Sequence, residues 1–148
     1  MGNICRSPAA EEIMRQTALT HGHADDYEID SAGTYPGHSG QLPDPRMREA
    51  AALRGYSLTH RARQVTYEDF DRFDMLIVMD ERNYDTVERM AFTLDDKAKI
   101  YRMADFCRIN GRDHVPDPYY EGREGFELVL DMLEEGCRNL YEYLEHEI

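Results

Sequence analysis

The residues best suited to chemistry lie at the start of the chain, where a short loop leads into a helix. The loop consists of Gly2, Asn3, Ile4, Cys5 and Arg6. Ser7 then suits the N-cap of the helix, and Pro8 suits its first helical position. A loop that enters a helix in this way directs several backbone N–H groups at one point, with the positive end of the helix dipole behind them. Because the planar fork of Arg6 can hold two oxygens at once, the sequence predicts an anion site that fits a phosphate group.

A second candidate for chemistry is Asp117, which lies far along the chain between Pro116 and Pro118. Taken alone, this tripeptide is typical of a turn, in which Pro118 keeps Asp117 extended. Beside a phosphate site, however, a positioned carboxylic acid could protonate a leaving oxygen. Tyr119 and Tyr120 follow directly and offer flat faces to an aromatic substrate, although core packing or phosphorylation would also explain them.

The composition restricts the classes of function. Thirty acidic residues against seventeen basic ones give a formal net charge of -13, which disfavours binding to nucleic acid or to anionic membranes. No apolar run approaches the roughly 20 residues that span a bilayer, and no signal peptide is visible. The three cysteines show no metal-ligand spacing, so we expect reduced thiols, a cytoplasmic location and no metal.

Hydrophobic periodicity indicates one domain over residues 1–148, in which helices alternate with short strands. The expected strands are 27–31, 73–79 and 99–103, and the expected helices are 7–20, 45–55, 81–90 and 124 onward. This alternation predicts an α/β fold with a parallel sheet and helices on both of its faces. Ligands bind such sheets at the carboxyl ends of the strands, where Ser31 and Asp80 fall.

Taken together, the loop and the Asp117-Pro118-Tyr119-Tyr120 motif resemble the low-molecular-weight protein tyrosine phosphatases. In that family the loop reads Cys-x-x-x-x-x-Arg-Ser, and the matching nucleophilic cysteine would precede Met1 by one residue. The resemblance therefore implies an N-terminally truncated chain that lacks the nucleophile and is inactive as it stands. It also implies a four-stranded parallel sheet whose central first strand lies upstream of Met1.

The resemblance assigns roles to individual residues. Arg6 and Asp117 are the catalytic residues, and the loop binds the phosphoryl group. Asn3 pins the loop, and its family partners match Ser7, Ser31 and His60. Read without the resemblance, Ser31 is a strand-end serine and His60 a surface histidine. Cys5 matches a second loop cysteine, not the nucleophile. Asp80 either steadies the loop or Arg6, or is a solvated strand-end aspartate.

The expected reaction is hydrolysis of phosphotyrosine through a phosphocysteine intermediate, without a metal or cofactor. The implied substrate is a phosphotyrosine protein or a small aryl phosphate, and inorganic phosphate or sulfate would bind the loop. The alternative is a non-catalytic domain that binds phosphate or phosphotyrosine. An arsenate reductase uses a similar loop but needs further cysteines to carry oxidation away, and residues 80–90 contain none.

Overall fold

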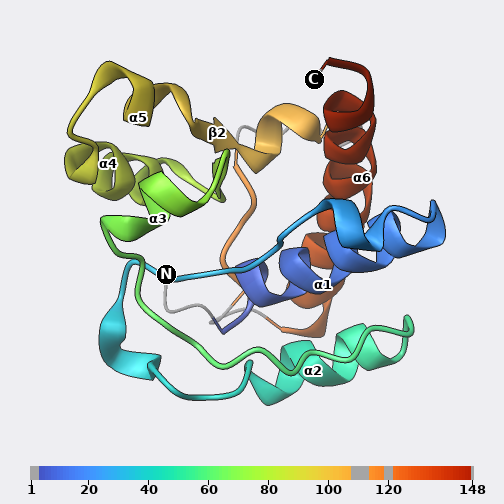
Figure 1. Ribbon diagram of the computed structural model, residues 1–148. Helices are drawn as coiled ribbons and strands as arrows, with labels where there is room; N and C mark the ends of the chain where they lie inside the picture. Colours follow the sequence, from blue (N-terminus) through green and yellow to red (C-terminus); the bar gives the residue numbers. More distant parts are fainter. Residues whose placement is uncertain (1–3, 108–113, 119–121, 148) are drawn as a thin grey trace.

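Figure 1 shows the computed structural model of the protein, in which residues 4–107, 114–118 and 122–147 are described. The two strands are β1 (Leu76–Val78) and β2 (Ile100–Arg102). The α-helices are α1 (Arg6–Thr20), α2 (Pro45–Ala52), α3 (Glu68–Arg72), α4 (Glu81–Met90), α5 (Leu94–Ala98) and α6 (Arg123–Glu147). Three 3-10 turns are η1 (Ala24–Asp26), η2 (Pro36–His38) and η3 (Met103–Phe106).

The predicted parallel pairing is confirmed for β1 and β2, which are joined through α4 and α5. Leu76 is in register with Ile100, and Val78 with Arg102. Side chains alternate across this short sheet: Val78 and Ile100 belong to a small core with Phe70 and Val87 from α3 and α4. Ile77 and Tyr101 point to the other face and pack against the main core. Helices therefore cover both faces, as the alternation of elements predicted.

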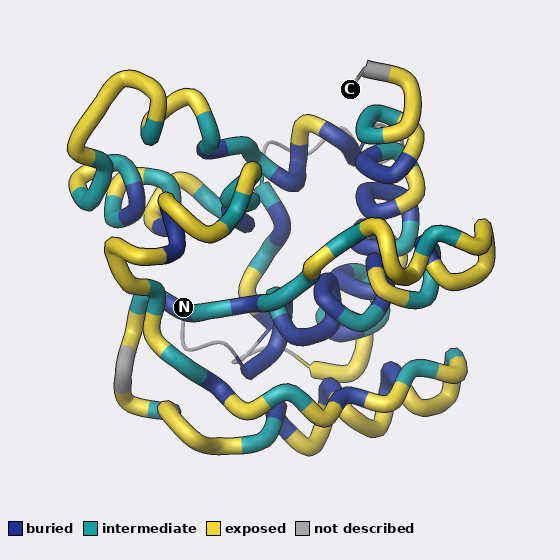
Figure 2. Tube along the Cα trace, viewed as in Figure 1, coloured by how far each residue is buried: buried dark blue, intermediate teal, exposed yellow. Residues whose placement is uncertain are grey.

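The main core lies where α1 and α2 pack against α6 (Figures 1 and 2). On α6 the buried residues recur at the three- and four-residue steps of an amphipathic helix: Phe126, Val129, Leu130, Leu133, Cys137 and Leu140. They meet Ala9, Ile13 and Met14 of α1 in the same cluster. The long C-terminal helix is therefore confirmed. Among the described helices, none combines the length and apolar character that crossing a bilayer requires.

The expected four-stranded sheet is not confirmed, because the described residues form a two-stranded sheet and one isolated parallel bridge between Gly33 and Gln64. The expected strand at 27–31 is absent from that sheet. Side chains take some of the backbone groups that a ladder would use: the Ser31 N–H donates to Asp30 Oδ1 at 2.8 Å, and Arg15 donates to the Ile29 carbonyl at 3.1 Å. An extended segment becomes a strand only where a neighbour offers ladder partners.

Two predicted helix starts are confirmed, and the predicted N-cap of α1 is wrong by two residues. Asp44 and Asp80 cap α2 and α4, each accepting a hydrogen bond from a backbone N–H of the first turn. By contrast, α1 begins at Arg6 with Cys5 at the N-cap, so Ser7 lies inside the first turn. Pro8 is tolerated there, because N–H groups of the first turn have no intrahelical acceptor. The short helices α3 and α5 were not predicted.

Candidate functional site

Arg6, the first residue of α1, lies at a junction of three segments of the chain. Its side chain is only 3% exposed. Nη1 donates to Asp80 Oδ2 at 2.8 Å and to the Val115 carbonyl at 2.7 Å. These bonds join the start of α1 to the start of α4 and to the segment that contains Asp117. The guanidinium is therefore fixed in position before any ligand arrives.

Asp117 lies on the same side of the molecule as Arg6. Its Oδ2 is 3.9 Å from Arg6 Nη2, and its side chain is 41% exposed. The Val115 N–H donates to the Met79 carbonyl at 2.8 Å, which ties this segment to the end of β1. The structure thus brings together the guanidinium and the carboxyl group that the sequence selected from distant positions. Their catalytic roles stay predictions.

Asp80 is a functional candidate that sequence reasoning left undecided between a solvated residue and a partner of Arg6. The structure places it in contact with Arg6, while its Oδ1 accepts the Asn83 N–H at 2.8 Å. Burial works to raise the pKa of the Asp80 carboxyl, but the Asn83 hydrogen bond and the Arg6 ion pair outweigh it and hold the pKa below its ordinary value. Asp80 therefore faces Arg6 as a carboxylate.

Besides Arg6, the described part of the predicted phosphate loop is Ile4 and Cys5, and both are buried. The Ile4 carbonyl accepts the Asp44 N–H at 2.8 Å, which joins the loop to the start of α2. Burial, reinforced by the charges of Asp44 and Asp117, raises the pKa of the Cys5 thiol to about 12. Cys5 is therefore a protonated, enclosed thiol. The other expected ligand-binding residues, Gly2, Asn3, Tyr119 and Tyr120, lie outside the described residues.

Ser31 and His60, the two expected supporting residues, converge on a residue that the sequence analysis missed. Ser31 Oγ donates to Glu11 Oε1 at 2.7 Å, and His60 Nδ1 lies 3.1 Å from the same oxygen. Glu11 is 7% exposed, and its second oxygen accepts from Arg15 at 2.9 Å. In the sequence Glu11 is marked only by its place one helical turn before Arg15 and three residues after Pro8; the structure shows that this is the buried side of α1. A charge there requires partners.

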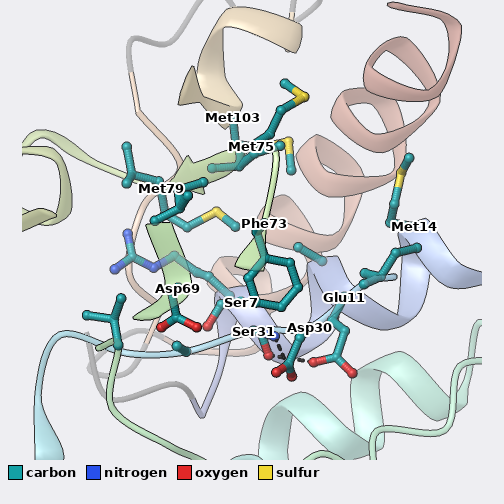
Figure 3. Close-up of a pocket in the computed structure, with 18 of the residues that line it drawn as sticks. Ser7, Glu11, Met14, Asp30, Ser31, Asp69, Phe73, Met75, Met79 and Met103 are labelled. Atoms are coloured by element: carbon teal, nitrogen blue, oxygen red, sulfur yellow. Dashed lines mark hydrogen bonds between the residues drawn. The ribbon is translucent and has the colours of Figure 1, made fainter. Parts of the chain in front are cut away.

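These groups border one cavity of about 940 Å³, shown in Figure 3. Ser7, Glu11, Asp30 and Ser31 line its polar side, with Asp69 nearby. The apolar side is formed by Phe73 and the methionines Met14, Met75, Met79 and Met103. Arg6 and Asp117 also line the cavity, so the Ser31–Glu11 cluster and the Arg6 site share one space.

Glu11, Asp30 and His60 are the one group in the described part of the chain that brings three possible metal ligands within 4.8 Å. Both carboxylates already have cationic partners, since Arg15 contacts Glu11 and Arg63 Nε lies 3.1 Å from Asp30 Oδ2. Their charge is therefore compensated within the protein. The donor set fits a hydrogen-bonded cluster between α1 and residues 30–31 and 60 better than a metal centre.

Comparison with known proteins identifies the family. The family model described as low molecular weight phosphotyrosine protein phosphatase matches residues 1–148. A low molecular weight protein-tyrosine-phosphatase of Streptomyces coelicolor is 41% identical over 141 residues, covering 94% of this chain and 86% of that protein. The low molecular weight protein-tyrosine-phosphatase YfkJ of Bacillus subtilis is 36% identical over 148 residues, covering 99% of this chain and 93% of that protein.

Solved structures agree with these matches. A protein tyrosine phosphatase of Entamoeba histolytica, crystallised with Hepes in its active site, superposes with a TM-score of 0.96 at 43% identity, covering 99% of this chain and 94% of that one. The crystal structure of YfkJ gives a TM-score of 0.91 at 36% identity, covering 99% of this chain and 91% of that one. With the family model matched along the entire sequence, the chain belongs to the low molecular weight phosphotyrosine protein phosphatase family.

Proposed function

We propose that the protein is a protein tyrosine phosphatase that hydrolyses phosphotyrosine through a phosphocysteine intermediate. The observation that carries the proposal is the buried Arg6 guanidinium at the start of α1, with the Asp117 carboxyl group 3.9 Å away. A fixed cation and the first-turn amides of a helix stabilise the charge of a transferring phosphoryl group. The relatives named above as protein-tyrosine-phosphatases support the assignment.

The reaction has two steps. A thiolate attacks phosphorus while the bond to the tyrosine oxygen breaks, and Asp117 gives its proton to the departing phenolate. Asp117 then takes a proton from water, which attacks phosphorus and displaces the thiolate, so phosphate leaves and the acid is restored. Throughout, Arg6 holds phosphoryl oxygens on the side of Nη2, because Nη1 is bound to Asp80 and Val115.

The three cysteines of the sequence are all buried, and none has the environment that a nucleophile of this mechanism needs. Burial raises the pKa of all three thiols: Cys5 to about 12, Cys107 to about 11, and Cys137 further still. A nucleophilic cysteine needs the opposite environment, one that lowers its pKa. We therefore assign the nucleophile to the residue before Met1, as the loop motif implies, and expect the chain as given to be inactive.

The large cavity supports the same proposal at the level of the fold. It lies between residues 26–35 and residues 72–79, so one edge of β1 borders it while β2 occupies the other edge. We assign this space to the central strand that would precede the phosphate loop, which would extend the sheet toward residues 27–31. In that case the upstream-extended chain should unfold at a higher urea concentration than the 148-residue chain. Its backbone amides at 27–31 should also exchange their hydrogens with solvent more slowly.

The decisive experiment compares the 148-residue chain with one extended by the residues encoded immediately upstream. Both are assayed on para-nitrophenyl phosphate and on a phosphotyrosine peptide. Only the longer chain should turn over either substrate. Equal turnover by the two chains refutes the missing-nucleophile assignment, and no turnover by a folded longer chain refutes the phosphatase proposal.

The burial of all three thiols also favours a second candidate function, a non-catalytic domain that binds phosphate or phosphotyrosine. Arg6 and the start of α1 would serve such a domain without any nucleophile. The Hepes seen in the Entamoeba histolytica active site carries a sulfonate, a tetrahedral anion of similar shape. Titration calorimetry with inorganic phosphate, comparing the 148-residue chain with its Arg6→Lys variant, tests binding apart from turnover. If the folded 148-residue chain gives no heat of binding with inorganic phosphate, this second function is excluded.

A further inference from the structure

Asn83, in the first turn of α4, is a polar residue with only 9% of its surface exposed. Its backbone N–H donates to Oδ1 of Asp80, the cap of the helix, at 2.8 Å. Its side chain turns back across the cap, and Oδ1 accepts the N–H of Met79 at 3.3 Å. A side chain at this helical position commonly bonds back to the N–H of the capping residue itself. Here it reaches one residue further, to the residue that follows β1.

The two bonds of Asn83 complete a closed circuit of hydrogen bonds at the Arg6 site. The Met79 carbonyl accepts the Val115 N–H at 2.8 Å. The Val115 carbonyl accepts from Arg6 Nη1 at 2.7 Å, and the same nitrogen donates to Asp80 Oδ2 at 2.8 Å. The second oxygen of Asp80 accepts the Asn83 N–H, which closes the circuit. This Asn83 circuit therefore joins the first turns of α1 and α4 to the segment that carries the proposed acid.

Most of the Asn83 circuit is shielded from water. Val115 has no exposed surface, and the exposed fractions of Met79 and Arg6 are 6% and 3%. Water therefore does not replace a bond that is lost between buried members, and a buried N–H left without an acceptor raises the free energy of the folded state. Hydrogen bonds that are linked in such surroundings also strengthen one another. Losing the acceptor at Asn83 therefore weakens the hold on Val115 through their shared partner Met79.

The Asn83 circuit bears on the position of the proposed acid. Asp117 is two residues after Val115, and the ring of Pro116 between them restricts the backbone. Fixing Val115 therefore limits where the Asp117 carboxyl group can lie. That group is 3.9 Å from Arg6 Nη2, and Nη1 of the same guanidinium belongs to the circuit. The circuit thus ties the acid and the phosphate-binding cation to one frame.

Deepening the proposed function, on which this inference rests, we propose that Asn83 is a positioning residue of the phosphatase reaction. By holding Met79, it keeps Val115 and the residues after it in place, so that Asp117 meets the departing phenolate beside the phosphoryl group. The alternative is a role in the stability of α4 alone. The two roles differ in their kinetics: a misplaced acid slows the reaction most where the leaving group most needs a proton, whereas lost stability affects all substrates alike.

Amide hydrogen exchange tests the circuit without any turnover. Asn83→Leu removes the side-chain acceptor but leaves the backbone N–H that Asp80 accepts. In the 148-residue chain, we expect the Val115 amide, followed by NMR, to exchange about tenfold faster in this variant. Asn139→Leu is the matched control, because it removes from α6 an asparagine bond to the Phe106 carbonyl, 2.6 Å long, and should leave Val115 exchange unchanged. The exchange of buried α6 amides corrects for any change in global stability.

The kinetics of the upstream-extended chain test the consequence. Asn83→Leu should lower kcat about tenfold on phenyl phosphate and about threefold on para-nitrophenyl phosphate, whose leaving group needs less protonation. In an Asp117→Asn background, the same change should lower kcat by less than about twofold, because no acid is left to misplace. Asn83→Asp keeps an acceptor oxygen at this position and should restore kcat to within about threefold of the parent chain. If Asn83→Leu does not fold, Asn83→Ala, which removes the same acceptor with less bulk, replaces it.

The outcomes separate this inference from the proposed function. The positioning role is overturned, while the phosphatase proposal stands, if the parent chain turns over both substrates and Val115 exchanges equally in Asn83→Leu and Asn139→Leu. Equal losses of kcat on the two substrates, or losses from Asn83→Leu and Asp117→Asn that simply multiply, have the same meaning. If a folded upstream-extended parent chain hydrolyses neither substrate, the phosphatase proposal fails, and the positioning role fails with it.

Discussion

Arg6 Nη1 and Asp80 Oδ2 lie 2.8 Å apart, and this ion pair joins the start of α1 to the start of α4. The two residues are 74 positions apart in the sequence. Without Asp80, the buried guanidinium would face only the more distant Asp117 carboxyl group, 3.9 Å away, when no phosphate is bound. The same pair sets the direction of Arg6, so that Nη2 faces Asp117. Asp80 therefore acts on the proposed chemistry by positioning Arg6.

The first prediction concerns Asp80→Asn. The amide oxygen can still cap α4 by accepting the Asn83 N–H, but the charge opposite Arg6 is lost. We expect the free energy of unfolding to fall by about 1–3 kcal/mol, and kcat/KM of the upstream-extended chain to fall about tenfold. Urea denaturation and steady-state kinetics measure the two effects. Asp85→Asn, at an exposed position of the same helix, is the control. Identical unfolding of the two variants contradicts the stabilising role of the pair.

The second prediction distinguishes an acid from a merely nearby carboxylate at position 117. In Asp117→Asn, no proton is available for the departing phenolate, so kcat should fall about a hundredfold on phenyl phosphate. The loss should be smaller on para-nitrophenyl phosphate, because nitrophenolate is a more stable anion and needs less protonation. Rates on a series of substituted phenyl phosphates measure this dependence. A uniform loss across the series contradicts general-acid catalysis by Asp117.

Much of the fold could be predicted because single residues indicate where helices begin. Asp44 before Pro45 and Asp80 after an apolar run are helix caps, and both helices begin directly after them. The sheet was harder, since a strand depends on partners that its own residues do not specify. Residues 27–31 read as a strand, yet their backbone is bonded to Asp30 and Arg15 side chains.

The candidate site was predictable where local chemistry is distinctive and not where it depends on long-range contact. Arg6 stood out because it lies in a loop that leads into a helix, and Asp117 because its motif together with that loop resembles the phosphatase family. Glu11 was missed because a glutamate in a helix is usually solvated, and only the folded chain brings Ser31 and His60 to it. Sequence reading does not reveal which carboxylate is buried.

The third prediction concerns that buried glutamate. Ser31→Ala removes the hydroxyl that donates to Glu11 Oε1 at 2.7 Å, which leaves a buried carboxylate with one fewer hydrogen bond. We expect the free energy of unfolding to fall by about 1–2 kcal/mol. The exposed Ser57 provides the matched control, since Ser57→Ala should change stability by less than about 0.5 kcal/mol. Equal midpoints in urea would show that the Ser31–Glu11 bond contributes nothing.

The fourth prediction is a pH dependence of stability at Asp69. Burial works to raise the pKa of its carboxyl, but the paired hydrogen bonds from Arg63, both 3.0 Å, and the Thr66 N–H bring it below the ordinary 3.8. A carboxyl group whose pKa is lower in the folded state stabilises that state above its ordinary pKa. This stabilisation is lost as pH falls through the folded value.

Asp69→Asn should accordingly cost about 1–3 kcal/mol at pH 7, and the difference from the parent chain should shrink progressively below about pH 4. Urea titrations at a series of pH values measure the difference. Asp71→Asn changes an exposed position of the same helix. Its free energy of unfolding should differ little from that of the parent chain, and this difference should not shrink as pH falls. If the difference in the free energy of unfolding between the parent chain and Asp69→Asn stays constant down to pH 2, the ion-pair assignment is contradicted.

The fifth prediction uses thiol reactivity to locate the nucleophile. A rise in the pKa of Cys5 from 9.0 to about 12 lowers its thiolate fraction at neutral pH about a thousandfold, and its side chain is also enclosed. Iodoacetamide should therefore leave Cys5, Cys107 and Cys137 of the folded 148-residue chain unmodified over hours at pH 7, whereas it labels all three in urea. The upstream-extended chain should gain one rapidly alkylated cysteine, located before Met1 and protected by inorganic phosphate. Mass spectrometry of the digested protein identifies the site. Rapid, phosphate-sensitive labelling of Cys5 instead would make Cys5 the reactive thiol and overturn the assignment of the nucleophile.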